Sequence, residues 1–128
     1  MNLTFSQEDL EFKEEVKDFI NKNLDKTTQK KINGGHHLSK DDLVNWQKKL
    51  YEKGWMAPNW PKEYGGTGWS ITQRYIFDEE CGAAAAPSAL PFGVTMVAPV
   101  IIKFGTDKQK EKYLPRILSS EDWWCQGY

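Results

Sequence analysis

The residues of this chain that could do chemistry are few and scattered. His36 and His37 are adjacent in a glycine-flanked stretch, but no E-x-x-H partner accompanies them, so an exposed pair is favoured over a metal site. The GGTG run at residues 65–68 lacks the G-K-[ST] ending of a phosphate-binding loop and follows no apolar strand, so it predicts a turn. The acidic residues 78–80 occupy successive helix positions and point in different directions, which favours a mostly solvated turn over an acid/base pair.

The cysteines and the basic segment do not build a reactive centre either. Cys81 and Cys125 lack C-x-x-C spacing and a nearby histidine, which favours free thiols in a reducing compartment and leaves no Cys-His or Ser-His-Asp arrangement to assign. Residues 108–116 carry four basic side chains. Glu111 lies among them, so an exposed helix face is favoured over binding to an anionic membrane or to the phosphates of coenzyme A.

Composition narrows the class of protein further. The 128 residues include 17 basic and 18 acidic side chains, and the formal charge of -1 gives no electrostatic footprint for nucleic acid. A hydrophobic share of 39% is enough for one modest core. The amino-terminal residues lack the apolar core of a secretion signal, and the apolar stretch at 90–102 is too short to cross a bilayer. We therefore expect one cytoplasmic domain that binds neither nucleic acid nor a membrane.

Capping patterns place the helices that carry these residues. Four predicted helix starts carry a pair in which Ser or Thr is followed three residues later by Asp or Gln, a pattern typical of a capping box. These pairs are Ser6–Asp9, Ser39–Asp42, Ser70–Gln73 and Thr106–Gln109. A further helix is predicted over residues 92–104. Its β-branched residues suit a strand as readily, but its length favours a helix.

Connections between these helices are predicted from Gly, Pro and polar residues. The polar stretch 29–37 is expected to be a loop, and residues 54–70, with three tryptophans, are expected to form an ordered loop pinned by those rings. Pro115 favours an interruption of the last helix. Trp123 and Trp124 have extended propensity, but the chain offers them no partner strand. From the residues alone, the prediction stops at a helical cytosolic domain.

Three longer motifs carry a resemblance to a known family. They are F-x-x-E-V-K-D-F at residues 12–19, GW-x-A-P-N-W-P-x-E-Y-G-G-T-G at 54–68, and GT-x-x-Q-K-x-K-Y-L-P-R-I-L at 105–118, which leads into W-W-C-Q-G-Y. In this order they resemble the N-terminal part of the acyl-CoA dehydrogenase family. The resemblance implies an all-α orthogonal bundle of about five to six helices over residues 1–121. Residues 122–128 would be a short extended segment, the first residues of a middle β-domain that continues as [ST]-E-P-x-A-G-S-D in relatives.

The resemblance also implies a reaction. Members of the family use FAD to oxidise an acyl-CoA thioester to its trans-2-enoyl form, with a glutamate removing the α-proton and the β-hydrogen passing as hydride to the flavin. Electron-transfer flavoprotein or a similar acceptor would be a partner, and the full-length protein would form homo- or hetero-oligomers. In the family the glutamate lies outside this part of the chain, so no catalytic residue is expected here. The alternative is a non-catalytic helical interaction module.

Five site residues follow from the same resemblance. Ser88, Phe92 and Met96 would line the acyl-chain cavity at helical spacing, although Phe92 and Met96 could equally be ordinary core residues. Gln126 and Tyr128 would lie beside the flavin ring at the start of the middle domain, and the alternative for them is a strand fragment without its ligand. No metal ligand is expected.

Overall fold

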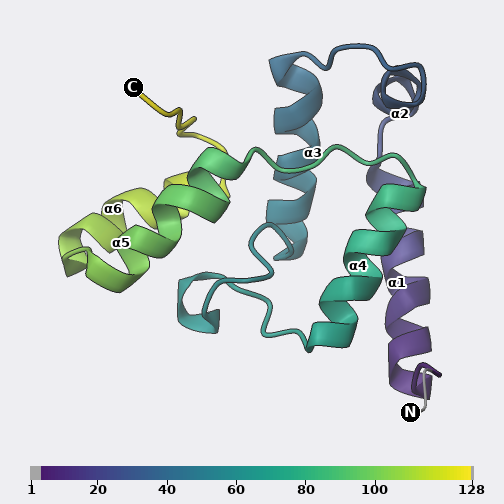
Figure 1. The fold of residues 1–128 in the computed structure, drawn as a ribbon, viewed down its shortest axis with the longest axis horizontal. Helices are drawn as coiled ribbons and strands as arrows, with labels where there is room; N and C mark the ends of the chain where they lie inside the picture. The colour runs from purple at the N-terminus through teal and green to yellow at the C-terminus, as the bar shows by residue number, and fades with distance from the viewer. Residues whose placement is uncertain (1–3, 128) are drawn as a thin grey trace. The chain divides into compact units, whose positions relative to one another are not determined.

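Residues 4–127 are described by a computed structural model, and within that range the chain contains α-helices, one short 3-10 helix, one π-helical segment and no strand. The expected all-α fold is confirmed (Figure 1). The helices belong to two compact units. The first consists of the residues up to 38 together with 69–87, and the second consists of 39–68 together with the residues from 88 onward.

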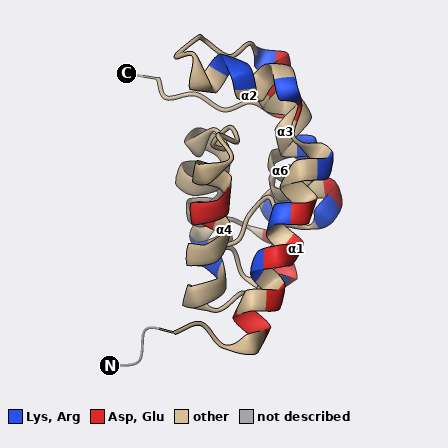
Figure 2. Ribbon diagram, turned by 90° about the vertical axis from the view of Figure 1, so that its right-hand side faces the viewer, with Lys and Arg blue, Asp and Glu red and all other residues tan. Residues whose placement is uncertain are grey.

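The first unit is built on a pair of helices that lie side by side (Figure 1). Its helices are α1 (Gln7–Asn23), α2 (Lys26–Asn33) and α4 (Ile71–Ala83). One face of α1 buries Phe12, Val16 and Ile20, which recur every four residues. Trp69 precedes α4, and its ring centroid lies 5.0 Å from that of Phe12 and 5.1 Å from that of Phe77. The charged residues of α1 are acidic in its first turn and of both signs farther along the helix (Figure 2). These aromatic contacts join α1 to α4.

Helix α2 includes residues 29–33 of the loop expected over residues 29–37, so the prediction is wrong for those residues, whereas 34–37 lie outside any helix. Asp25 caps the helix by accepting a hydrogen bond from the Thr28 backbone N–H at 2.8 Å. Thr28 is buried, and Gln29 Nε2 donates to the carbonyl oxygen of Ala84, at the end of α4, at 2.7 Å. The segment is helical because a cap and tertiary contacts hold it, although it has little apolar periodicity.

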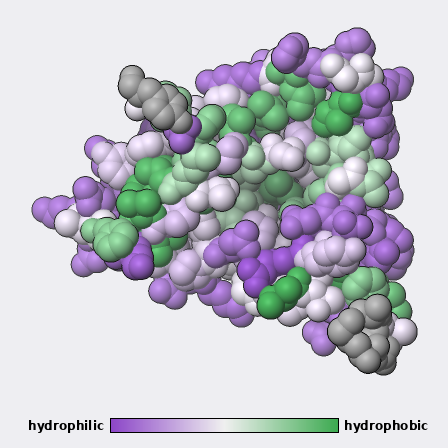
Figure 3. All heavy atoms as spheres, in the orientation of Figure 1, coloured by the Kyte–Doolittle hydropathy of each residue, from purple (hydrophilic) through white to green (hydrophobic). Residues whose placement is uncertain are grey.

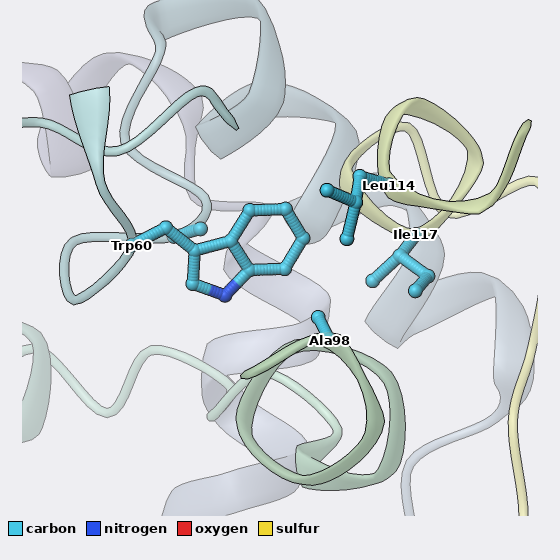
Figure 4. Packing of buried hydrophobic residues seen from close by; sticks show 5 residues of the cluster. Trp60, Ala98, Leu114 and Ile117 are labelled. Atoms are coloured by element: carbon cyan, nitrogen blue, oxygen red, sulfur yellow. The ribbon is translucent and has the colours of Figure 1, made fainter. Parts of the chain in front are cut away.

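The second unit gathers its core around one tryptophan. Its elements are α3 (Lys40–Lys53), η1 (Lys62–Tyr64), η2 (Phe92–Val97), α5 (Ala98–Phe104) and α6 (Asp107–Leu118). Trp60, from the loop after α3, packs in one buried cluster with Ala98 of α5 and with Leu114 and Ile117 of α6 (Figure 4). The loop expected to be pinned by aromatic rings is therefore ordered as predicted, with Trp55 buried as well.

The GGTG run makes the predicted turn. Gly65 and Gly68 have φ angles of 96° and 66°, which lie in the left-handed region that favours glycine. A Cβ at Gly66 would overlap the carbonyl oxygen of Trp60, so only glycine fits there. The glycines of this run therefore allow the loop to fold back on Trp60.

All four predicted capping boxes are present. Each Ser or Thr accepts from the backbone N–H three residues later, and each Asp or Gln side chain accepts in return from the cap residue's N–H. At α3, Ser39 Oγ lies 3.2 Å from the Asp42 nitrogen, and Asp42 Oδ2 lies 2.7 Å from the Ser39 nitrogen. The short-range sequence pattern therefore fixes four helix starts.

The predicted interruption at Pro115 is wrong, because α6 runs through it to Leu118. Leu114 and Ile117 flank the proline and are 2% and 3% exposed. Burial of both side chains against Trp60 requires the helical spacing to continue, and this outweighs the hydrogen bond that a proline cannot donate. After α6, residues 121–127 lie outside any helix, where the extended segment was expected.

Replacing Ser39 by Ala should lower the free energy of unfolding by about 1 kcal/mol, because the Asp42 backbone N–H would lose its acceptor. Ser39→Gly should cost only a few tenths of a kcal/mol. Urea unfolding followed by circular dichroism measures both. Equal stability of Ser39→Ala and the parent chain would contradict the role given to this cap.

Candidate functional site

The three residues predicted to line an acyl cavity all lie in the second unit. Phe92 and Met96 belong to η2, and Met96 is 44% exposed while Phe92 is half-buried. Ser88 is exposed and precedes the helix, so helical spacing does not relate it to the other two. The structure therefore places Phe92 and Met96 on one helical segment and Ser88 in the non-helical segment that precedes it.

Gln126 of the C-terminal segment reaches this helix. Its Nε2 lies 3.6 Å from Met96 Sδ, within the distance of a weak N–H···S hydrogen bond. Gln126 is exposed, and Tyr128 lies outside the described residues. One residue predicted to contact a flavin and one predicted to contact an acyl chain are thus side by side. We refer to Met96 and Gln126 together as the Met96–Gln126 corner.

Apolar side chains continue along the surface from this corner. Val100 and Phe104 of α5 follow Met96 at four-residue intervals and are 55% and 74% exposed. Figure 3 shows apolar side chains reaching the surface over α5 and α6. A groove of about 320 Å³ runs here, with Tyr113 and Trp124 in its lining. Their rings pack edge to face, with centroids 5.7 Å apart. Met96, Val100 and Phe104 therefore form an exposed apolar stripe beside this groove.

Two residues that the sequence analysis did not assign to the site hold its helix in place. Gln47 of α3 is only 4% exposed, and its Oε1 accepts a hydrogen bond from the Leu90 N–H at 3.2 Å. Trp60 donates its indole N–H to the carbonyl oxygen of Val94, in η2, at 2.8 Å. The signal in the sequence was a glutamine on the apolar face of an amphipathic helix. An amide that is buried there needs hydrogen-bond partners.

An ion pair secures the segment that carries Gln126. The Arg116 guanidinium donates two hydrogen bonds to Asp122, at 2.8 and 2.7 Å, and Glu121 lies 3.2 Å away. The hydrogen bond from Arg116 lowers the pKa of Asp122 and raises that of Arg116. These hydrogen bonds connect Asp122, at the start of the C-terminal segment, to α6.

The histidines and acidic residues that the sequence analysis considered belong to the first unit, whereas Met96 and Gln126 belong to the second. Asp78 and Glu79 are exposed, as predicted for a mostly solvated acidic turn, and Glu80 pairs with Lys13 at 3.2 Å inside the first unit. His36 and His37 are exposed in their loop. Across residues 4–127 no three His, Cys, Asp or Glu side chains gather as metal ligands, and no helix has the length and apolar character needed to cross a membrane.

Comparison with known proteins decides the family. Residues 6–121 match the family described as acyl-CoA dehydrogenase, N-terminal domain. This chain belongs to the acyl-CoA dehydrogenase family. Its relatives include acyl-CoA dehydrogenase IpdE1 of Mycolicibacterium smegmatis, 35% identical over 123 residues that cover 92% of this chain and 31% of the relative. Mitochondrial isovaleryl-CoA dehydrogenase of Arabidopsis thaliana is 33% identical over 94% of this chain and 29% of its own length.

Two solved structures share the fold of this chain. The ChsE4–ChsE5 complex from Mycobacterium tuberculosis matches with a TM-score of 0.75 and 29% identity, over 94% of this chain and 30% of that one. The Tcur3481–Tcur3483 steroid acyl-CoA dehydrogenase also gives 0.75, with 34% identity over 94% and 31% of the two chains. The present chain therefore spans less than a third of the length of the curated relatives and solved structures it matches.

The two cysteines of this acyl-CoA dehydrogenase domain differ in exposure and surroundings. Both are free thiols, as predicted; Cys125 is exposed and Cys81 is half-buried. Burial first, and then the carboxylates of Asp78 and Glu80, raise the pKa of Cys81 to about 12. The Cys81 thiol of the unfolded chain loses its proton at a lower pH than that of the folded chain. The free energy of unfolding is therefore unaffected by this thiol below about pH 9 and decreases as the pH rises toward 12.

Iodoacetamide at pH 8 should therefore alkylate Cys125 readily. It should alkylate Cys81 at least about a hundredfold more slowly, because the thiolate is the nucleophile. Mass spectrometry of peptides sampled over time measures the two rates. In urea the rates should converge, which controls for local sequence effects. Equal rates in the folded protein would contradict the buried, carboxylate-flanked setting of Cys81.

Proposed function

We propose that residues 1–121 are the N-terminal helical domain of an FAD-dependent acyl-CoA dehydrogenase, and that residues 122–128 begin its middle β-domain. The complete enzyme oxidises an acyl-CoA to the trans-2-enoyl-CoA. The observation that carries this proposal is the Met96–Gln126 corner, because it brings together residues assigned to the substrate and to the flavin from segments 30 residues apart. Membership of the family supports the reaction class.

The chemistry of the corner suits an acyl chain on one side. Phe92 and Met96 are apolar, and the stripe continues over Val100 and Phe104, so an alkyl or ring-bearing acyl group gains by leaving water along it. The unbranched thioether of Met96 adapts to irregular ligand shapes. Ser88, in the non-helical segment before η2, would contact the acyl group with its hydroxyl.

The other side of the corner fits a flavin. The exposed side chain of Gln126 ends in an amide, a group that can both donate and accept hydrogen bonds, as the mixed polar edge of an isoalloxazine ring does. Tyr128 is proposed to act beside it. When bound, FAD supplies the two-electron oxidation. The residues of this chain bind and orient, and the base that takes the α-proton is proposed to lie outside these 128 residues.

Substrate and partners follow at a coarser level. A solved structure that this chain resembles is described as a steroid acyl-CoA dehydrogenase, so steroid-derived acyl-CoA thioesters belong in any substrate panel beside straight and branched chains. Another is a complex of two chains, and we infer that the full-length protein also forms a homo- or hetero-oligomer. Electron-transfer flavoprotein or a similar protein would reoxidise the flavin in a cytoplasmic setting.

The full-length protein should carry flavin and should reduce an artificial electron acceptor when given its preferred acyl-CoA. Met96→Ala should lower kcat/KM for that substrate by about tenfold or more, because an apolar contact with the acyl group is lost, while the flavin absorption band stays unchanged.

Ile71→Ala is the matched control, since Ile71 is 79% exposed and belongs to the first unit; its kcat/KM should equal that of the parent enzyme. A full-length protein that binds flavin but oxidises no acyl-CoA of the panel would disprove the proposed function. Equal kcat/KM for Met96→Ala and the parent would remove Met96 from the acyl site.

A further inference from the structure

The helix that carries Phe92 and Met96 has an unusual hydrogen-bond register. The N–H of Ala98 donates to the carbonyl oxygen of Gly93, five residues earlier, whereas an α-helix would pair it with Val94. The next residue, Pro99, has no N–H to donate. In the π register the Val94 oxygen would accept a hydrogen bond from the N–H of residue 99, five residues later, and this residue is the proline. The helix itself therefore leaves the Val94 oxygen without a backbone partner.

Trp60 supplies the missing donor. Its indole N–H reaches the Val94 oxygen at 2.8 Å, and its ring is 5% exposed and packed with Ala98, Leu114 and Ile117. Figure 4 shows the indole nitrogen on the side of the ring that faces the helix of Ala98. Since a carbonyl left unpaired in such a place is costly, the bond from Trp60 favours the π register. In an α register the Ala98 N–H would occupy the same oxygen.

The register determines the direction of the side chains before it. A π turn holds one residue more than an α turn, and one residue corresponds to about 100° of rotation. A change of register at Gly93 and Val94 would therefore turn Phe92 away from its present face relative to α5. Gln47, which holds the Leu90 N–H, fixes the entry to the same turn from α3. Single π turns of this kind are frequent at functional sites.

We propose that Trp60 is a positioning residue whose indole N–H holds the π turn of η2 and so sets the face that Phe92 presents to the substrate. The part of this proposal that concerns an acyl substrate rests on the proposed function. The part that concerns the register of the helix rests on the hydrogen bonds alone.

Scalar couplings across hydrogen bonds, measured by NMR on this chain, test the register directly. In the parent chain we expect couplings from Trp60 Nε1 to the Val94 carbonyl carbon and from the Ala98 amide nitrogen to the Gly93 carbonyl carbon. In Trp60→Phe, which keeps an aromatic ring but removes the N–H, the Ala98 coupling should move to Val94. Trp55→Phe is the control, because it removes another buried indole of the same unit and should leave the Ala98 coupling with Gly93.

An Ala98 coupling that stays with Gly93 in Trp60→Phe would overturn the proposal. So would the absence of the coupling between Trp60 and Val94 in the parent chain, a measurement that does not depend on the variant folding. In the full-length enzyme, Trp60→Phe should change the ratio of kcat/KM between long and short acyl-CoA substrates, and Trp55→Phe should not. If no acyl-CoA is oxidised at all, the proposed function fails, and the NMR couplings still decide the role of Trp60.

Discussion

The second unit depends on one side chain that satisfies two different demands. The Trp60 ring fills the space between α5 and α6, where Ala98 is small enough to admit it, and its N–H meets a carbonyl that the helix cannot pair. Packing and hydrogen bonding are joined here, because one orientation of the ring both buries its surface and places its nitrogen 2.8 Å from the Val94 oxygen. The loop that presents Trp60 turns back at Gly66, where no side chain would fit.

The candidate site lies at the edge of this arrangement. Met96, on η2, is 44% exposed, and Gln126 reaches it from a segment joined to α6 by the Arg116–Asp122 pair. A charged, exposed ion pair and a buried aromatic cluster thus hold the two sides of the Met96–Gln126 corner by different means. Salt screens the first far more than the second, so the position of Gln126 is the more sensitive of the two to solution conditions.

Local patterns predicted the features that depend on neighbouring residues. Capping boxes need only a spacing of three, and each of the four predicted from sequence is present. Predictions failed where distant residues decide the outcome. Helix α2 is held by Gln29 against Ala84, 55 residues away, and α6 continues through Pro115 because Leu114 and Ile117 are both needed in the core. The bonds from Gln47 and Trp60 span 43 and 34 residues, and no local spacing encodes them. Phe92, Met96 and Gln126 were named only through the resemblance to a family.

We propose that an acyl chain and a flavin meet at the Met96–Gln126 corner. A crystal structure of the full-length protein with FAD and a non-reactive acyl-CoA analogue tests this claim most directly. We expect the acyl group in contact with Met96 and a polar atom of the flavin within hydrogen-bond distance of the Gln126 amide. A structure in which protein side chains cover both residues while the acyl group and the flavin bind elsewhere would contradict it.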